Sequence, residues 1–284
     1  MKNGRAIRLY AVTALTLGLL LAASPARAQF QPRPVDDPAT GERYHIEAAA
    51  GFWFPSTEMN ISSTALGQIG SLIDFKRDLG LQDQHFSELH LVLRPSKSHK
   101  FRLQYIPLNY EQTGLLPATI IFNGQRYDIG LPVNSTLDWK AWRLGYEYDF
   151  IVKDRGFGGF LLDFKYTDVS ATLASSIRAD FVQASAPIPT IGGIFRVYPV
   201  PNVSITGEVS GFSLGWLPNS IIKENDGHYA DVDFYGTVNF TNYVGVQVGY
   251  RSFDVAYQIG RGGVLTDTGA FTVKGLYFGV VARY

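Results

Sequence analysis

The sequence contains no cysteine and few histidines. Without cysteine, a disulfide framework and the lipid-anchored cysteine of a bacterial lipoprotein are both excluded, so packing, hydrogen bonds and ion pairs must hold the fold. The histidines lack the spacing of metal ligands, and two of them fall on opposite faces of one predicted strand. We therefore predict no metal site and no cofactor. The five histidines are His45, His85, His90, His99 and His228.

Long apolar runs are also missing, with one short exception near the N-terminus. Basic residues precede an apolar run at residues 11–24, and residues 25–28 have the small-x-small pattern of a signal-peptidase site. The run is shorter than the roughly 20 residues that a transmembrane helix needs. We predict a signal peptide at residues 1–28, cleaved after Ala28, and an exported protein without a transmembrane helix.

A strong net charge of either sign is absent. The full chain carries 25 Lys and Arg against 25 Asp and Glu, and the predicted signal peptide holds four of the basic residues. The mature chain would carry a net charge of about −4, which gives no basic field for nucleic acid. Aromatic residues, in contrast, make up 14% of the chain, and there are 29 glycines. This composition favours many β-strands over the helices of a soluble α/β enzyme.

The mature chain divides into a short lead-in and one long β domain. Residues 29–43 are rich in proline and charge, so we expect a mobile periplasmic lead-in. Residues 44–284 alternate apolar and polar side chains in segment after segment, which is typical of half-buried strands. Within the connection 55–84, residues 63–81 favour a helical turn and a small strand equally. The ten predicted strands cover residues 44–54, 85–94, 100–122, 125–150, 160–167, 190–198, 203–214, 228–240, 243–257 and 274–284.

Asn123 and Gly124 give the strongest two-residue hairpin signal in the chain. If the chain folds back at this pair, residues 114–117 lie opposite residues 130–133, so the two arms lose their alternation at the same height. We therefore predict one tall hairpin over residues 100–150, with an ordered and exposed tip.

The last predicted strand, residues 274–284, ends the chain on an aromatic residue with apolar residues at alternate positions behind it. Those residues are Leu276, Phe278, Val280, Ala282 and Tyr284. A strand of this kind resembles the C-terminal assembly signal of bacterial outer-membrane β-barrels. The resemblance implies an all-β fold, a transmembrane antiparallel up-and-down β-barrel of about ten strands, with 8 or 12 as alternatives. It also implies a place in the bacterial outer membrane, contact with lipid and lipopolysaccharide, and assembly by the barrel assembly machinery.

The predicted connections alternate in length, which agrees with that resemblance. They are short after strands two, four, six and eight, and long after the others, with residues 171–189 and 258–269 among the long ones. Outer-membrane barrels have short periplasmic turns and longer outside loops, so we expect both termini in the periplasm. A secreted soluble β-sandwich is the alternative fold, because its strands alternate too. The sequence does not indicate the oligomeric state.

The side chains predicted to face inward carry charges of both signs in nearly equal number. A narrow ten-stranded barrel must pair or hydrate such charges, so we predict a charge-plugged lumen. The alternative is a narrow polar pore for small solutes through the same residues. The inward charges are Glu47, Glu88, Glu147, Asp149, Asp163, Glu208, Asp231, Asp233, Arg94, Arg102, Arg143, Lys165, Arg196, Arg251 and Arg283.

Two short patterns offer an enzymatic alternative. Asp83-Gln84-His85 and Asp231-Val232-Asp233 lie at predicted strand ends. They are similar to the Asp-x-His and Asp-x-Asp pairs of omptin-family outer-membrane proteases, in which a histidine and carboxylates activate water. Here the pairs occur in the reverse chain order. We transfer no catalytic role and predict a non-enzymatic surface, structural or binding protein, with omptin-like proteolysis as an alternative.

Overall fold

The computed structural model describes residues 39–63, 70–176, 179–218, 225–261 and 264–284. The predicted signal peptide and most of the lead-in lie outside these residues. Among the residues described, none of the helices has the length and apolar character needed to cross a membrane.

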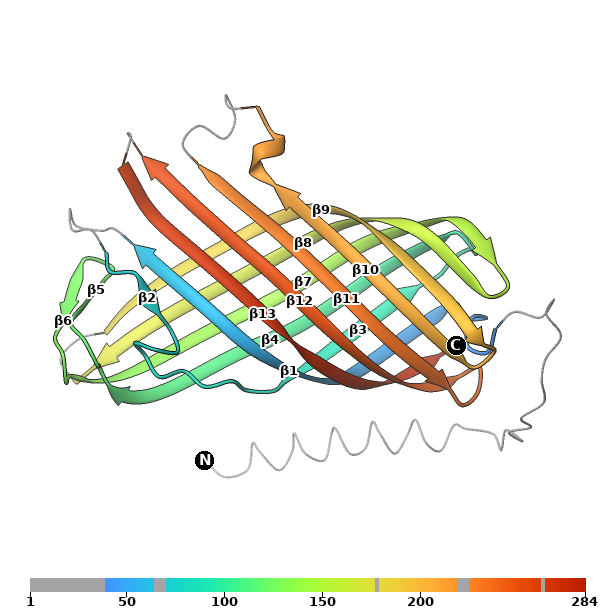
Figure 1. Cartoon of the computed structure of the whole chain (residues 1–284), viewed down its shortest axis with the longest axis horizontal. Helices are drawn as coiled ribbons and strands as arrows, with labels where there is room; N and C mark the ends of the chain where they lie inside the picture. Colours follow the sequence, from blue (N-terminus) through green and yellow to red (C-terminus); the bar gives the residue numbers. More distant parts are fainter. Residues whose placement is uncertain (1–38, 64–69, 177–178, 219–224, 262–263) are drawn as a thin grey trace. The chain divides into compact units, whose positions relative to one another are not determined.

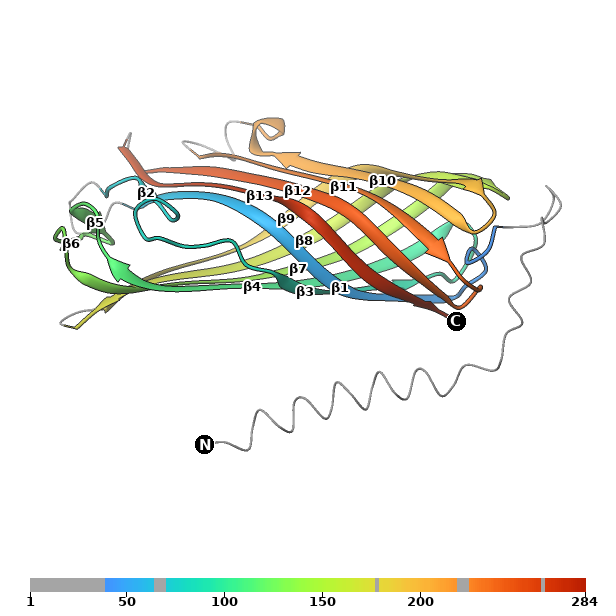
Figure 2. The ribbon, with the colours of Figure 1, turned by 60° about the horizontal axis from the view of Figure 1, so that its bottom comes forward.

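Ten long antiparallel strands form a closed barrel, as predicted. Each strand pairs with its neighbours in chain order, and β13 pairs with β1 from Arg283↔Glu47 to Asp267↔Ser63 to close the wall. Figures 1 and 2 show these two strands side by side. The barrel strands are β1 (Ile46–Ser63), β3 (Phe86–Leu93), β4 (His99–Leu115), β7 (Pro132–Lys153), β8 (Gly156–Ser175), β9 (Ala179–Val200), β10 (Val203–Ser213), β11 (Asp226–Asn239), β12 (Val244–Arg261) and β13 (Val264–Arg283).

Alternation along each strand separates an apolar outer surface from a mixed interior. Because successive side chains point to opposite faces, one apolar row per strand faces outward. The predicted faces are confirmed, since the charges assigned inward are buried or half-buried. A continuous exposed apolar band of this kind suits lipid rather than water. Outward residues, one from each barrel strand, are Phe52, Leu89, Phe101, Leu144, Phe164, Phe195, Val209, Phe234, Val248 and Phe278.

One end of the barrel, here called the terminal end, holds Tyr284 and the short turns. Residues 39–43 pack there, which corrects the prediction that the lead-in is mobile up to residue 43. The Thr40 amide donates to Pro201 O at 2.8 Å. Arg94 Nη1 and the Tyr198 hydroxyl donate to the Glu42 carboxylate at 2.9 and 2.7 Å. These contacts anchor the segment because two opposed charges and a hydroxyl satisfy one another away from water.

Two of the predicted long loops are wrong, because the strands continue through them. β8 and β9 pair as far as Ala174↔Ala179, inside the predicted loop 171–189. β12 and β13 pair as far as Arg261↔Val264, inside the predicted loop 258–269. Backbone ladders continue here without a regular alternation, because large apolar side chains such as Leu173 and Phe181 fall on the inner and outer faces alike, among small and polar ones. Periodicity shows only half-buried strands, so it could not detect these extensions.

The opposite end, here called the loop end, is capped by two inserted elements. The tall hairpin exists, with Gly114 opposite Val133. It carries β5 (Ile120–Phe122) and β6 (Gln125–Tyr127) around a turn with φ of 49° at Asn123 and 72° at Gly124. These angles match the predicted turn. The tip is not exposed, however: Gly124 is buried, and Ile120, Phe122 and Tyr127 join the core.

The second cap is the segment from residue 70 to residue 84. It contains both of the elements that the sequence left open, the short strand β2 (Ile73–Asp74) and then a helical turn, in which the Asp78 amide donates to Asp74 O at 2.8 Å. Because β3 is short, this segment takes the place beside β1 on the loop-end side of β3. Figure 1 shows β2, β5 and β6 together at the end of the barrel away from the C-terminus.

Candidate functional site

A layer of charged side chains crosses the lumen in the half nearer the terminal end. Arg102 from β4 donates to Glu208 on β10, and Arg251 from β12 donates to Glu88 on β3. Such pairs join strands from opposite parts of the wall. A buried charge is costly unless it is paired in this way.

Further ion pairs join the same layer. The Lys100 ammonium lies 2.6 Å from Glu147 and 2.9 Å from Asp149, and all three side chains are almost fully buried. Arg143 bonds Glu208 at 3.2 Å and pairs with Asp163 at 2.8 Å. Lys165 and Asp231 lie 2.6 Å apart at the edge of the layer that faces the loop end. The layer is therefore a compact network of opposite charges.

Beyond this layer, the loop half of the lumen is apolar. Its aromatic side chains pack edge to face, with the rings of Trp139 and Phe253 5.1 Å apart. Buried inward residues of this half include Trp53, Met59, Ile61, Leu137, Trp139, Leu173, Phe253, Phe271 and Val273. The interior thus changes from ionic to apolar along the barrel axis, which the sequence analysis did not predict.

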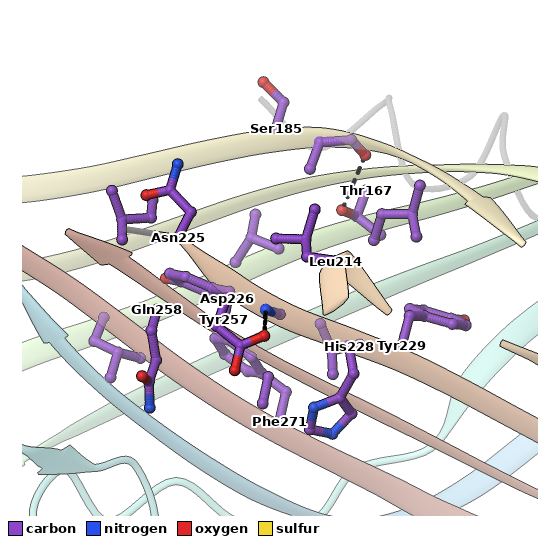
Figure 3. Close-up of a pocket in the computed structure, with 18 of the residues that line it drawn as sticks. Thr167, Ser185, Leu214, Asn225, Asp226, His228, Tyr229, Tyr257, Gln258 and Phe271 are labelled. Carbon is purple, nitrogen blue, oxygen red and sulfur yellow. Dashed lines mark hydrogen bonds between the residues drawn. The ribbon is translucent and has the colours of Figure 1, made fainter. Parts of the chain in front are cut away.

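The apolar half contains a cavity of about 400 Å³. Its floor includes Trp139, Thr167 and Tyr229, close to the Lys165–Asp231 pair. Figure 3 shows side chains from several strands around this space, among them Thr167, Leu214, Tyr257 and Phe271. An engineered apolar cavity of about 150 Å³ binds benzene, so this space suits a molecule of about ten to fifteen carbon atoms.

The barrel wall is interrupted beside this cavity. β10 pairs with β9 only between Val200 and Ile191, and it ends at Ser213, where the 3-10 helix η1 (Leu214–Trp216) begins. In the described residues, β9 therefore has β8 on one side from 179 to 190 and no strand on the other. In Figure 1, β8 and β9 continue beyond the end of β10.

We call this interruption the notch, bounded by residues 179–190 of β9 and by residues 225–228 at the start of β11. The cavity reaches both of its edges, because its lining includes residues 185–188 of β9 and residues 225–229 at the start of β11. Consecutive residues of a strand point to opposite faces. On β9, which has no strand on one side from 179 to 190, a lining that includes both faces places the cavity beside the uncovered strand edge.

Two prolines in β9 are a sequence signal for the notch. Pro187 and Pro189 lie in β9, opposite Tyr166 and Phe164 of β8. Proline lacks the N–H that a strand donates to its neighbour, so within sheets it is confined to edges, first residues and bulges. Two prolines at alternate positions of a long strand therefore indicate an edge.

The structure does not bring the two omptin-like pairs together. His85 is exposed on the outer surface, where its ring stacks on Phe54 with centroids 5.8 Å apart. Asp83 is held by Lys76 and the Thr57 amide in the cap. Asp231 and Asp233 lie inside the barrel, paired with Lys165 and Arg251. Charges already neutralised by cations in separate places do not form a water-activating site.

The histidines are dispersed. His90 lies in the lumen, 3.1 Å from Gln104, and His228 faces outward, 2.8 Å from Asp254. Over the described ranges, no group of three or more His, Cys, Asp or Glu side chains could hold a metal ion.

Comparisons with known proteins were made for sequence and for structure. No protein-family model and no curated protein matches the sequence. In structure, the chain is similar to the outer-membrane protease OmpT from Escherichia coli, with a TM-score of 0.58, 9% identity, and coverage of 88% of this chain and 100% of that chain. The chain has the fold of a bacterial outer-membrane β-barrel.

Two further solved structures resemble the chain more loosely. A FadL homologue from Pseudomonas aeruginosa has a TM-score of 0.38 at 7% identity, covering 89% of this chain and 94% of that one. The attachment invasion locus protein Ail of Yersinia pestis has a TM-score of 0.32 at 7% identity, covering 82% and 97%. The likeness to OmpT, at 9% identity, concerns the fold alone.

Proposed function

We propose that this protein is an integral outer-membrane barrel that binds a small apolar molecule in the cavity of its loop half, here called the chamber. The molecule enters the chamber sideways through the notch. The observation that carries the proposal is a cavity of about 400 Å³ whose lining runs to both strand edges at the notch. Apolar lining favours an apolar ligand because burial removes both surfaces from water.

The position of the notch supports entry from the membrane. The last pair of β9 and β10 before the notch is Ile191↔Gly211, and Ile191 faces outward. Further along β8, Tyr166 is exposed opposite Pro187 of the notch edge, and Trp216 of η1, which follows the end of β10, is 62% exposed. Exposed Trp and Tyr side chains are typical of the membrane interface. An apolar molecule dissolved in the outer leaflet would meet the notch without first crossing water.

The charged layer supports a binding or receiving role rather than an open pore. Its side chains are buried and paired across the lumen, and residues 39–43 pack against the turns of the terminal end. We expect no ohmic conductance steps from the purified protein in planar bilayers. Stable steps of defined conductance would favour the narrow pore instead.

Binding can be measured by methyl NMR of isoleucine-labelled protein in deuterated lipid nanodiscs, with 2-isopropylnaphthalene as the probe. Ile188 lines the cavity, Ile191 faces lipid, and Ile194 is buried in a separate cluster with Phe157 and Leu161. We expect the Ile188 methyl resonance to shift saturably, while that of Ile194 does not move. A shift confined to Ile191 would report partition into lipid only and would contradict the proposal.

A cavity-filling variant gives the matched control. Ala171 is buried and lines the cavity, whereas Thr172, the next residue in β8, is on the opposite face. Ala171→Phe should remove the Ile188 shift, and Thr172→Phe should keep it. Equal responses would show that the probe binds elsewhere.

Sideways entry has its own test. The natural chain lacks cysteine, so Ser185→Cys and Asn225→Cys place the only thiols on the two notch edges. Bridging them with a cleavable bifunctional maleimide should slow probe exchange at least about tenfold, and cleavage should restore it. Unchanged exchange would refute the side entry while leaving the chamber as a binding site.

A further inference from the structure

The lining of the chamber changes from apolar to polar towards the notch. Buried apolar side chains such as Leu137 and Phe271 line its inner part. The polar lining residues Ser185, Asn225 and Asp226 belong instead to the two edges of the notch. Figure 3 shows Ser185 on one edge and the other two on the opposite edge. A ligand that matches this lining has an apolar body and a polar group that stays at the notch.

Asp226 is the polar side chain at the notch that can recognise a charge. It is exposed, and its Oδ1 accepts from the Gly227 amide at 2.7 Å. Within the described parts of the chain, no lysine or arginine pairs with this carboxylate. Its negative charge is therefore available to a ligand at the opening of the chamber.

The other carboxylates of the outer wall beside the notch are engaged within the protein. Asp254 lies 2.8 Å from His228 Nε2 and accepts from the Thr272 hydroxyl at 2.6 Å. On the other side of the notch, Asp168 accepts from Gln183 Nε2 at 3.2 Å. These contacts leave Asp226 as the carboxylate that a ligand can pair with.

We infer that the ligand of the chamber is a hydrophobic amine, whose ammonium group stays at the notch beside Asp226 while its apolar body fills the chamber. This inference rests on the proposed function. An ammonium inside the apolar chamber would lose its hydration at a large cost. At the exposed edge of the notch it keeps contact with water and is attracted by the carboxylate. A carboxylic acid of the same shape is repelled there.

The test compares three probes of similar shape at pH 7: 2-(aminomethyl)naphthalene, which is a cation, 2-ethylnaphthalene, which is neutral, and 2-naphthoate, which is an anion. Binding is followed by the Ile188 methyl resonance in nanodiscs of zwitterionic lipid and is corrected for partition into empty nanodiscs. The wild type should bind the amine about threefold more tightly than the hydrocarbon, the size of an exposed ion pair, and should bind the anion most weakly. High salt should reduce this preference.

Two substitutions of Asp226 separate its charge from its shape. Asp226→Asn should bring the affinities for the amine and the hydrocarbon close together, and Asp226→Lys should reverse the order of the amine and the anion. Glu58→Gln is the control and should keep the wild-type order, because Glu58 is an exposed carboxylate of β1 that does not line the chamber.

The outcomes distinguish the inference from the proposed function. If none of the three probes shifts the Ile188 methyl resonance, the proposed function fails. If the amine and the hydrocarbon bind the wild type equally, or if Asp226→Lys leaves the order of the probes unchanged, the chamber stands and the inference about its ligand is overturned.

Discussion

Substitution of Glu208 should show whether water reaches the charged layer. Its carboxylate, on β10, accepts hydrogen bonds from Arg102, from Arg143 at 3.2 Å and from the Tyr235 hydroxyl at 3.1 Å. Removing one partner of a buried ion pair costs about 3–5 kcal/mol, because the remaining charge stays buried without compensation. Glu208→Gln keeps the volume and removes the charge.

The surrounding contacts place the expected cost at the lower end of that range. Arg102 keeps Glu147 at 2.6 Å, and Arg143 keeps Asp163 at 2.8 Å. Each arginine therefore retains one carboxylate after the substitution. We expect Glu208→Gln to lower the free energy of unfolding by about 3 kcal/mol.

The assay is reversible unfolding by guanidinium from lipid vesicles, followed by tryptophan fluorescence. Val209→Ile, at the next residue but on the outward face, is the control and should change the free energy by less than about 0.5 kcal/mol. A loss below about 1 kcal/mol for Glu208→Gln would mean that water screens the arginines. That result would refute the closed layer and favour a hydrated conduit.

Three further predictions concern the wall, the seam and the cap. Val248 faces outward and Gln247 inward. In the same assay, Val248→Arg should therefore lower the free energy of unfolding by about 2–4 kcal/mol, and Gln247→Arg should lower it by less. Equal losses would mean that the register of β12 is wrong. The Tyr284 carbonyl accepts from the His45 and Ile46 amides at 2.6 and 2.9 Å, so deleting Tyr284 should leave export intact and abolish the heat-modifiable gel mobility of the assembled barrel, whereas normal mobility would show that the seam closes without it. In the cap, burial raises the pKa of Asp83, but hydrogen bonds from Lys76 and the Thr57 amide outweigh it and leave the pKa below its ordinary value. Asp83 therefore stabilises the cap above the ordinary carboxyl pKa of about 4, and this stabilisation is lost as the pH falls through the lowered value. Proteolysis of residues 70–84 by an acid-active protease should accelerate in that window in the wild type, and Asp83→Asn should be cleaved quickly at every pH; a flat profile in the wild type would contradict the linkage.

Much of the barrel follows from local rules that the sequence states by itself. Alternation assigned the outward rows and the inward charges correctly, because a strand gives each residue only two directions. Asn123 and Gly124 predicted their turn, because few other pairs accept positive φ at both positions. The terminal strand and the count of strands predicted a closed barrel. Where apolar residues fall on both faces of a strand among small and polar ones, as in residues 171–189, the pattern vanishes and the prediction failed.

Only the tertiary structure decided the candidate site. The sequence supplied balanced charges, but closure of the barrel determined that Arg102 meets Glu208, a residue 106 positions away. The chamber exists because inward rows from many strands converge, and the notch exists because β10 is shorter than β9. Differences in strand length become a gap only when the strands lie side by side. For the same reason, the sequence could not show that the two omptin-like pairs lie apart. The His85 side chain is on the outer surface of the barrel, and the Asp233 side chain is in the lumen.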